Sequence, residues 1–118
     1  MQYMLLLYSD FSSFQKLTPE EQKKGYGAYQ AFTEALRKSG VYQASGRLRP
    51  TSDATTVRVS NDKTQVLNGP YVETKEQLAG YYLIDVPDLD AAISWGARCP
   101  GASHGTVEIR PLWVMQSS

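Results

Sequence analysis

The stretch from Asn68 to Val86 constrains the fold of this chain more than any other segment. It begins with a Gly69-Pro70 step, continues through a group of charged side chains and ends in an almost wholly apolar run. A proline ring keeps the preceding residue out of the helical region, so the chain must turn or extend at Gly69. An apolar run of this length that follows a bend predicts a central strand at about residues 79–86.

The charged part of the same stretch carries a helix signal. Thr74 is followed three residues later by Gln77, which is the spacing of a capping box. The pattern predicts a single helical turn that begins after Thr74 and ends at Gly80. The free amide groups at the start of such a turn could hold an anion.

The segments before this stretch form one β-α-β half, and those after it complete a second half. Residues 2–8 are mainly apolar at both odd-numbered and even-numbered positions, so both faces of a strand there would be apolar. This predicts a strand that is buried on both faces and central in a sheet. Residues 9–17 are predicted to be a polar connector. In chain order the expected elements are a strand at 2–8, a helix at 18–39, an extended segment at 41–49, a hairpin of strands 55–59 and 64–67, a strand at 79–86, a helix at 88–99 and a strand at 105–110.

Both helices have recognisable ends. Thr18 is an N-cap, Pro19 occupies the first helical position and Glu21 completes a capping box. Gly40 ends the first helix because glycine readily adopts the left-handed conformation. Asp88 is the expected N-cap of the second helix. The predicted buried stripe of that helix comprises Leu89, Ala92, Ile93, Gly96 and Cys99, with Trp95 at its edge.

The order of these elements predicts an α+β fold. Without the hairpin it is β-α-β-β-α-β, the ferredoxin-like plan, here with an inserted β-hairpin. Both helices would pack on one face of the sheet. A second copy of the chain would cover the other face, so that the partner is the chain itself. We expect residues 1–118 to form a single domain.

Charge and cysteine content narrow the class of protein. Twelve basic residues balance twelve acidic ones, so nothing favours attraction to nucleic acid or to an anionic membrane. The apolar N-terminal run is too short for a membrane span and lacks the basic start of a signal peptide. Cys99 is the single cysteine. These features favour a cytoplasmic protein without a disulfide.

The charged group Glu73, Lys75 and Glu76 is the first candidate for chemistry. Two acids and one base within four residues could serve a proton-transfer site. The alternative is a solvated turn with local ion pairs, each of which contributes well under about 1 kcal/mol.

Asp85 is the second candidate, because it stands in an otherwise apolar strand. Its alternation places it on the same face as Tyr81, where a buried carboxylate would need a partner such as Arg110 or would have a raised pKa, as a general base does. Glu108 lies on the same polar face as Arg110. The alternative is that Asp85 contacts solvent or the start of the second helix.

The other polar residues give weaker signals. His104 is the single histidine and is expected in an exposed loop, and Cys99 is expected in the core. One histidine without a cluster of cysteines or acids predicts no metal site. The loop after the first strand, Tyr8 to Asp10, lies where ligands often bind. We expect no metal ion and no covalent cofactor.

The chain resembles the YCII-related superfamily, and in particular the branch named for a DGPF motif. The motif here is Asn68-Gly69-Pro70-Tyr71 and continues to Val86; residues 1–8, 54–58 and 107–111 also resemble the family. Asn68 replaces the acid of the motif and Tyr71 replaces its phenylalanine.

The resemblance implies a ferredoxin-like domain that pairs as a dimeric α+β barrel. Proteins of the DGPF branch are mostly uncharacterised, and many are encoded beside extracytoplasmic-function (ECF) sigma factors. Relatives elsewhere in the superfamily include a dehydrochlorinase, for which a His-Asp pair has been proposed as active site. This chain has no histidine in its first strand and helix, and His104 does not match that pair.

Three functions follow as hypotheses. The leading one is a small-molecule-binding or regulatory accessory protein. The second is a lyase-like or isomerase-like enzyme with Asp85 or Glu73 as base and Lys75 or Arg110 holding an anionic substrate. The third is a protein-protein module for a sigma factor. The expected ligand-binding residues are Tyr8, Tyr71, Glu73, Lys75, Glu76, Tyr81 and Arg110.

Overall fold

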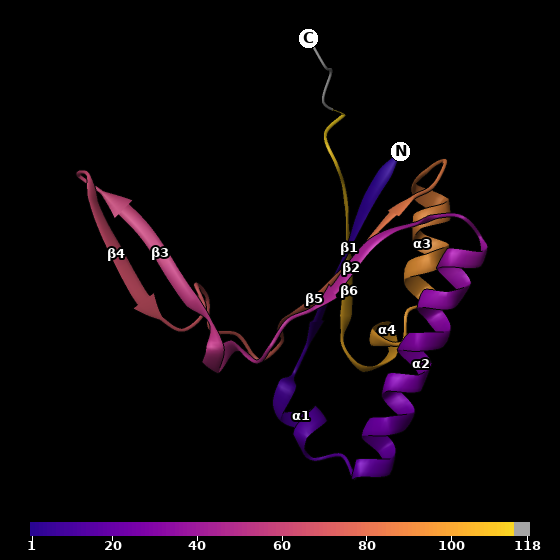
Figure 1. The fold of residues 1–118 in the computed structure, drawn as a ribbon, viewed down its shortest axis with the longest axis horizontal. Coiled ribbons are helices and arrows are strands. Elements are labelled where there is room, and N and C mark those ends of the chain that lie inside the picture. Colours follow the sequence, from indigo (N-terminus) through magenta and orange to yellow (C-terminus); the bar gives the residue numbers. More distant parts are fainter. Residues whose placement is uncertain (115–118) are drawn as a thin grey trace.

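The computed structural model describes residues 1–114 and has a mixed α+β architecture (Figure 1). The sequence predicts a frayed end at residues 116–118, and these positions lie outside the described residues. In chain order the elements are β1 (Gln2–Ser9), α1 (Phe11–Gln15), α2 (Pro19–Lys38), β2 (Tyr42–Arg47), a 3-10 turn (Thr51–Asp53), β3 (Thr55–Ser60), β4 (Lys63–Asn68), β5 (Gln77–Asp85), α3 (Leu89–Arg98), α4 (Gly101–His104) and β6 (Thr106–Pro111).

The main sheet has the strand order β2-β5-β1-β6, and every neighbouring pair is antiparallel. With the β3–β4 hairpin set aside, this is the order of a ferredoxin-like β-α-β-β-α-β domain. The predicted fold class is therefore confirmed. The predicted central strands are confirmed too, because β1 lies between β5 and β6, and β5 lies between β2 and β1.

Helices α2 and α3 cover one face of this sheet, and the core lies between them and the strands (Figure 1). Tyr3, Leu5 and Leu7 of β1 point into the core, while the alternate residues Met4 and Leu6 are only half-buried. The prediction that β1 is buried on both faces is thus wrong for the single chain, because helices cover only one side. The core comprises Tyr3, Leu5, Leu7, Phe32, Leu36, Tyr82, Ile84, Val86, Ala92 and Cys99.

The predicted ends of α2 are confirmed in atomic detail. The Thr18 hydroxyl accepts a hydrogen bond from the Glu21 amide at 3.1 Å, and the Glu21 carboxylate accepts one from the Thr18 amide at 3.0 Å. This reciprocal pair satisfies amide donors that have no partner within the helix. The backbone amide of Thr18 also lowers the pKa of the Glu21 carboxyl. At the other end, Gly40 has a φ of 72°, as predicted for the residue that ends the helix.

Helix α3 begins as predicted, with the Asp88 carboxylate accepting from the Ala91 amide at 2.9 Å. Its buried stripe is only partly as predicted. Leu89 and Ile93 are both 49% exposed, whereas Trp95 packs on Phe32 with the ring centroids 6.2 Å apart. The helix is therefore rotated toward its tryptophan, because the larger aromatic ring fills the space beside Phe32.

Two local predictions are wrong. Residues 9–17 are not a plain connector, since they contain α1, whose N-cap Asp10 accepts from the Ser12 amide at 3.0 Å. No helical turn follows Thr74. Instead, the side-chain amide of Gln77 donates to the carbonyl oxygens of Val72 and Thr74, at 3.1 and 2.8 Å, and β5 begins at Gln77 itself. The polar side chain stabilises an irregular loop in place of a helix.

The predicted hairpin is confirmed and forms a separate two-stranded sheet. Asn61 and Asp62 connect its strands with φ values of 52° and 63°, the conformation of the turn that best suits a two-residue hairpin. We refer to residues 55–68 as the arm, because they project away from the rest of the domain (Figure 1).

One tyrosine of the core and one that packs against it predict a loss of stability at high pH. Burial, the largest cause, raises the pKa of Tyr29 to about 12 and also raises the pKa of Tyr82. Because the folded state favours the protonated tyrosines, their contribution to stability is fully present below about pH 10. It is lost as the pH rises toward 12 and the hydroxyls ionise. After allowance for solvent screening at the partly exposed Tyr29, we expect a loss of about 1–2 kcal/mol.

This prediction can be checked by urea unfolding at a series of alkaline pH values, with tyrosinate absorbance recorded in parallel. Tyr29→Phe should flatten the pH dependence relative to the wild type. An unfolding midpoint that stays constant while the absorbance rises would contradict the prediction.

Candidate functional site

A groove of about 670 Å³ lies at the end of β1 that leads into α1, beside the base of the arm. Three segments enclose it: Tyr8 of β1, the residues between β2 and β3, and the loop between β4 and β5. Most of its wall is apolar. The lining residues are Tyr8, Leu48, Arg49, Pro50, Thr51, Asp53, Ala54, Pro70, Tyr71, Val72, Thr74, Glu76, Gln77 and Leu78.

Polar side chains meet at one side of this groove because of the register between β1 and β6. Tyr8 pairs with Thr106, and Glu108 follows two residues later on the same face. The Tyr8 hydroxyl donates to the Glu108 carboxylate at 3.2 Å, and the Thr106 hydroxyl donates to the Glu76 carboxylate at 2.8 Å. We call Tyr8, Glu76, Thr106 and Glu108 the Tyr8 cluster.

The electrostatics of the cluster keep Tyr8 protonated. Partial burial, followed by the charge of Glu108 and the hydrogen bond to it, raises the Tyr8 pKa, and the positive charge of Arg110 lowers it by a smaller amount. A tyrosine with a raised pKa is a hydrogen-bond donor at neutral pH. The cluster therefore presents two carboxylates and a phenol oxygen, whose hydrogen is donated to Glu108, at the rim of an apolar groove.

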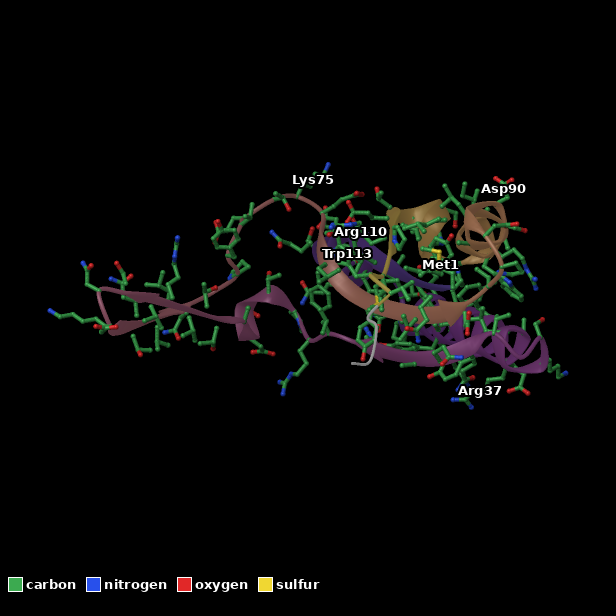
Figure 2. The ribbon with its side chains drawn as sticks, turned by 90° about the horizontal axis from the view of Figure 1, so that it is seen from above. Met1, Arg37, Lys75, Asp90, Arg110 and Trp113 are labelled. Carbon is green, nitrogen blue, oxygen red and sulfur yellow. The ribbon has the colours of Figure 1, made fainter. Side chains whose placement is uncertain are left out.

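The structure brings together some of the predicted ligand residues. Tyr8, Tyr71 and Glu76 all line the groove. Glu73 and Lys75 are exposed on the loop that joins the arm to β5, and Figure 2 shows Lys75 projecting from that loop. The charge of Lys75 contributes to the lowered pKa of the Asp10 carboxyl, although hydrogen bonding to the Ser12 hydroxyl is the larger cause.

Tyr81 and Arg110 lie outside the groove, on the face of the sheet that the helices leave uncovered. The ring of Tyr81 occupies the space over Gly46, where an added Cβ atom would be 2.8 Å from a ring carbon. Arg110 pairs with Met4 and stands two residues after Glu108, on the same face of β6. Both residues therefore border the Tyr8 cluster without lining the groove.

Asp85 lies at the opposite end of the sheet. It pairs with Gln2, and its carboxylate accepts a hydrogen bond from the Met1 amino group at 2.8 Å. Ser9, at the groove end of β1, is seven residues away, which corresponds to about 23 Å of strand. Within one chain, Asp85 and Glu73 cannot act on the same small molecule, and Asp85 is exposed rather than buried beside Arg110.

The remaining candidates are accounted for by local structure. His104 is exposed at the end of α4, a short helix where a loop was expected, and Cys99 is buried in the core as predicted. Burial is the main cause of the raised pKa of the Cys99 thiol. Across residues 1–114, histidine, cysteine, aspartate and glutamate side chains do not gather in groups of three that could hold a metal ion.

Three arginines that stand close in the sequence are separated by their partners. The Arg47 guanidinium stacks over the rings of Phe14 and Tyr26, at 5.3 and 4.7 Å from their centroids. Arg49 pairs with Asp53 at 3.0 Å. Arg58 lies 5.9 Å from the centroid of the Tyr71 ring. They do not form a single basic patch.

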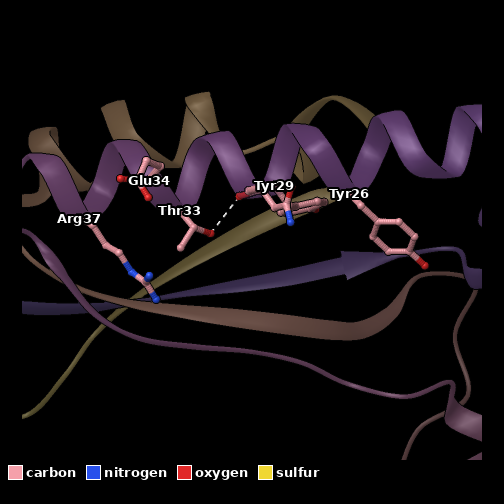
Figure 3. A pocket seen from close by; sticks show the side chains of 6 residues that line it. Tyr26, Tyr29, Thr33, Glu34 and Arg37 are labelled. Atoms are coloured by element: carbon pink, nitrogen blue, oxygen red, sulfur yellow. Dashed lines mark hydrogen bonds between the residues drawn. The ribbon is translucent and has the colours of Figure 1, made fainter.

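A second cavity of about 600 Å³ lies along α2 (Figure 3). It is lined by Tyr26, Tyr29, Gln30, Thr33, Glu34 and Arg37. One of its hydroxyls already has two partners: Thr33 donates to the Tyr29 carbonyl at 2.9 Å and must accept from Tyr82, 2.7 Å away, because a hydroxyl has one hydrogen. The Thr33 hydroxyl therefore has no hydrogen left to donate to a ligand in this cavity.

The face of the sheet that the helices leave uncovered carries the predicted ligand residues Tyr81 and Arg110. Register places two rows of four residues on it, and we call this surface the open face. The first row is Ala44, Leu83, Met4 and Arg110, and the second is Gly46, Tyr81, Leu6 and Glu108. The alternation within β1 was the signal for it, because Met4 and Leu6 stand between the core residues.

Comparisons with known proteins agree with this architecture. Residues 1–116 match the sequence profile described as the YCII-related domain. An uncharacterised protein of Rhizobium meliloti (strain 1021) is 38% identical over 114 residues, which span 95% of this chain and 92% of that protein.

A solved structure shares the fold. It is that of 5-chloro-2-hydroxyhydroquinone dehydrochlorinase (TftG) from Burkholderia phenoliruptrix AC1100 in complex with 2,5-dihydroxybenzoquinone, with a TM-score of 0.56 and 14% identity over 96% of this chain and 94% of that one. That protein has the dimeric α+β barrel fold, the fold class predicted here. Within residues 1–114, no helix combines the length and the apolar composition needed to cross a membrane.

Proposed function

This chain belongs to the YCII-related domain family, and we propose that it binds a small organic molecule beside Tyr8 as a homodimer. The observation that carries the proposal is the position of the Tyr8 cluster at the rim of the groove. Tyr8 belongs to both, since its ring lines the groove while its hydroxyl bonds Glu108. An apolar cleft with a few convergent polar groups is the usual form of a small-molecule site.

The lining favours a planar ligand that bears hydroxyl or carbonyl groups. Tyr8 and Tyr71 offer ring surfaces, and Leu48 and Leu78 add apolar wall. Glu76 and Glu108 accept hydrogen bonds, so they suit ligand hydroxyls. The hydroxyl of Tyr8 donates its one hydrogen to Glu108, so its oxygen can accept a hydrogen bond from a ligand hydroxyl. We expect ligands of the size of a substituted single ring.

The open face supports the homodimer. Its central side chains Met4, Leu6, Tyr81 and Leu83 are only half-buried within the single chain, although they stand on the two central strands. Covering these side chains with the same face of a second copy would remove their apolar surface from water. The zero net charge of the chain adds no long-range repulsion between copies.

The dimer is tested by sedimentation equilibrium. The wild type should be dimeric, and Leu83→Arg, which places a charge in the centre of the open face, should be monomeric. Leu89→Arg is the matched control, because Leu89 is an exposed leucine of helix α3. A wild type that is monomeric at every concentration would remove the homodimer from the proposal.

Ligand binding is tested by thermal shift and calorimetry. The first probe is 2,5-dihydroxybenzoquinone, the compound in the structure of the dehydrochlorinase, followed by a panel of small phenols and quinones. Tyr8→Phe removes only the hydroxyl and should weaken binding about tenfold, the effect of one lost hydrogen bond to a polar ligand. Tyr42→Phe is the control, because the Tyr42 hydroxyl bonds Ser45 away from the groove.

A panel that produces no shift in the wild type, or a Tyr8→Phe variant that binds as tightly as Tyr42→Phe, would overturn this site.

Proton-transfer catalysis is the second candidate, favoured by the hydrogen bond between Tyr8 and Glu108. A carboxylate that accepts from a phenol can relay a proton to or from a bound ring. Glu108 meets this requirement better than the predicted bases, because Asp85 is at the far end of the sheet and Glu73 is exposed on its loop. Glu108→Gln should then retain ligand binding and lose turnover, which is followed by the absorbance of the ligand.

Two further expectations belong to this proposal. The single cysteine and the short apolar N-terminal run favour a cytoplasmic location, and the family resemblance implies an ECF sigma factor as protein partner. Co-purification of the chain with the sigma factor encoded nearest to it tests the second, and absence of that sigma factor from the purified complex would remove it.

A further inference from the structure

The arm has one apolar and one polar face, and the apolar face packs on nothing within residues 1–114. Because paired residues of a hairpin share a face and successive residues alternate, Val57, Val66, Val59 and Thr64 stand on one face. We call this the valine face. The opposite face carries Thr56, Arg58, Ser60, Lys63, Gln65 and Leu67.

The polar face of the arm has partners at its base, and the valine face does not. The Thr56 hydroxyl donates to the Gly69 carbonyl at 2.8 Å, and Arg58 stacks on Tyr71. On the other side, Val57, Val59 and Val66 are 59%, 68% and 60% exposed. Alternation of β-branched apolar residues is the pattern of a strand that packs one face on a core, yet no core lies under these valines within residues 1–114.

The arm needs cover for its own stability. An isolated two-stranded hairpin is at best marginally stable in water, and a third strand or a packed face is required to hold it. Strands β3 and β4 pair only with each other in the described part of the chain. A surface outside this chain must therefore pack on the valine face if the arm is to be a stable element.

The direction of the arm identifies that surface. In Figures 1 and 2 the sheet separates the helices from the arm, so the arm projects on the side of the open face. Any second copy that covers the open face occupies the same side. The arm of one copy then runs alongside the other, and two-fold symmetry repeats the contact.

The area of the interface gives an independent reason. Strand spacing and rise give the four-stranded open face an area of about 400 Å², and one face of the arm about 200 Å². A standard interface needs roughly 800 Å² from each partner. The open face alone supplies about half of this amount, and the arm brings the total to about three quarters.

We propose that the valine face of the arm is a second dimerisation surface, which packs on the other copy of the chain and secures the pairing of the open faces. This inference rests on the proposed homodimer. It also gives the dimer a connection to the ligand site, because the two segments at the base of the arm, residues 48–54 and 70–78, form the walls of the groove beside Tyr8.

The test places two lysines on each face of the arm in turn. Val57→Lys with Val66→Lys should weaken dimerisation at least about tenfold, because it introduces two charges into an apolar contact. Ser60→Lys with Gln65→Lys adds the same charge to the polar face and should weaken dimerisation less than about threefold. Dissociation constants come from sedimentation equilibrium.

A second measurement needs no substitution. Amide hydrogen exchange of residues 55–68 in the wild type should be slower above the dissociation constant of the dimer than below it, because packing on the partner protects the hairpin. This readout remains valid even if the lysine variants unfold the arm.

The outcomes separate the two proposals. A monomeric wild type overturns the homodimer and the arm contact together. A dimeric wild type whose dissociation constant responds equally to both lysine pairs, and whose arm exchanges at a rate independent of concentration, overturns the arm contact alone and leaves the open-face dimer intact.

Discussion

Gly105→Ala should destabilise the protein by about 3 kcal/mol, at the upper end of the range for overpacking a tightly filled position. A Cβ atom at residue 105 would lie 2.1 Å from the backbone oxygen of Tyr8 and 3.2 Å from the Cα atom of Ser9. Both are backbone atoms of β1 and its end, so they cannot rotate away as a flexible side chain would. The strand β6 must move instead.

The same substitution should damage the Tyr8 cluster. Gly105 directly precedes Thr106, whose hydroxyl bonds Glu76, and a shift of β6 would also move Glu108 away from Tyr8. We therefore expect the loss of stability in urea unfolding to be accompanied by weaker binding of any groove ligand. If the Gly105→Ala variant bound the ligand as tightly as the wild type, the geometry of the Tyr8 cluster would be intact. That result would contradict this part of the prediction.

Gly27→Ala is the matched control for Gly105→Ala. No atom lies within 4 Å of an added Cβ at Gly27, which is inside helix α2. Alanine is favoured over glycine within a helix by about 1 kcal/mol, so this variant should be more stable than the wild type. If both substitutions changed the unfolding midpoint in the same direction, close backbone packing at Gly105 would not be the cause.

Leu36→Ala should cost about 3–4 kcal/mol, which combines the lost transfer of the side chain from water with the cavity that remains. Leu36 is 0% exposed and lies in the same core cluster as Leu5 and Ile84. It stands on α2, the long helix that covers the sheet. Its loss should also loosen the packing of that helix on β1.

The control for Leu36→Ala is Leu89→Ala in helix α3, where the leucine is 49% exposed. We expect a change below about 1 kcal/mol there, because little of the side chain leaves water on folding. Urea unfolding of both variants at one protein concentration checks the comparison, since self-association would make the midpoint depend on concentration. Equal losses at the two positions would contradict the assignment of Leu36 to the core.

Local rules predicted the parts of the fold that depend on neighbouring residues. The capping box at Thr18, the N-cap at Asp88 and the left-handed Gly40 all follow from side chains that satisfy backbone groups within a few positions. Where two local interactions compete, the rules fail. Thr74 and Gln77 have capping-box spacing, but Gln77 bonds the carbonyl oxygens of its loop and β5 starts there instead.

The candidate site depended on the pairing of distant strands. Tyr8, Glu76, Thr106 and Glu108 come from three separate segments, and only the β1–β6 register and the loop before β5 bring them together. Tyr8 and Glu76 were proposed as ligand residues from local features alone, whereas Thr106 carried no signal of its own. Asp85 was proposed because it interrupts an apolar strand, and its actual partner, the Met1 amino group, is 84 positions away in the chain.

The sequence by itself determined the order and the type of the main elements, and with them the ferredoxin-like class, because helix caps, β-branched runs and apolar periodicity act over short distances. Only the tertiary structure decided which face of β1 is covered, where the arm points and which carboxylates meet Tyr8. These features depend on strand register and helix rotation, which are set by side-chain packing between residues far apart in the chain.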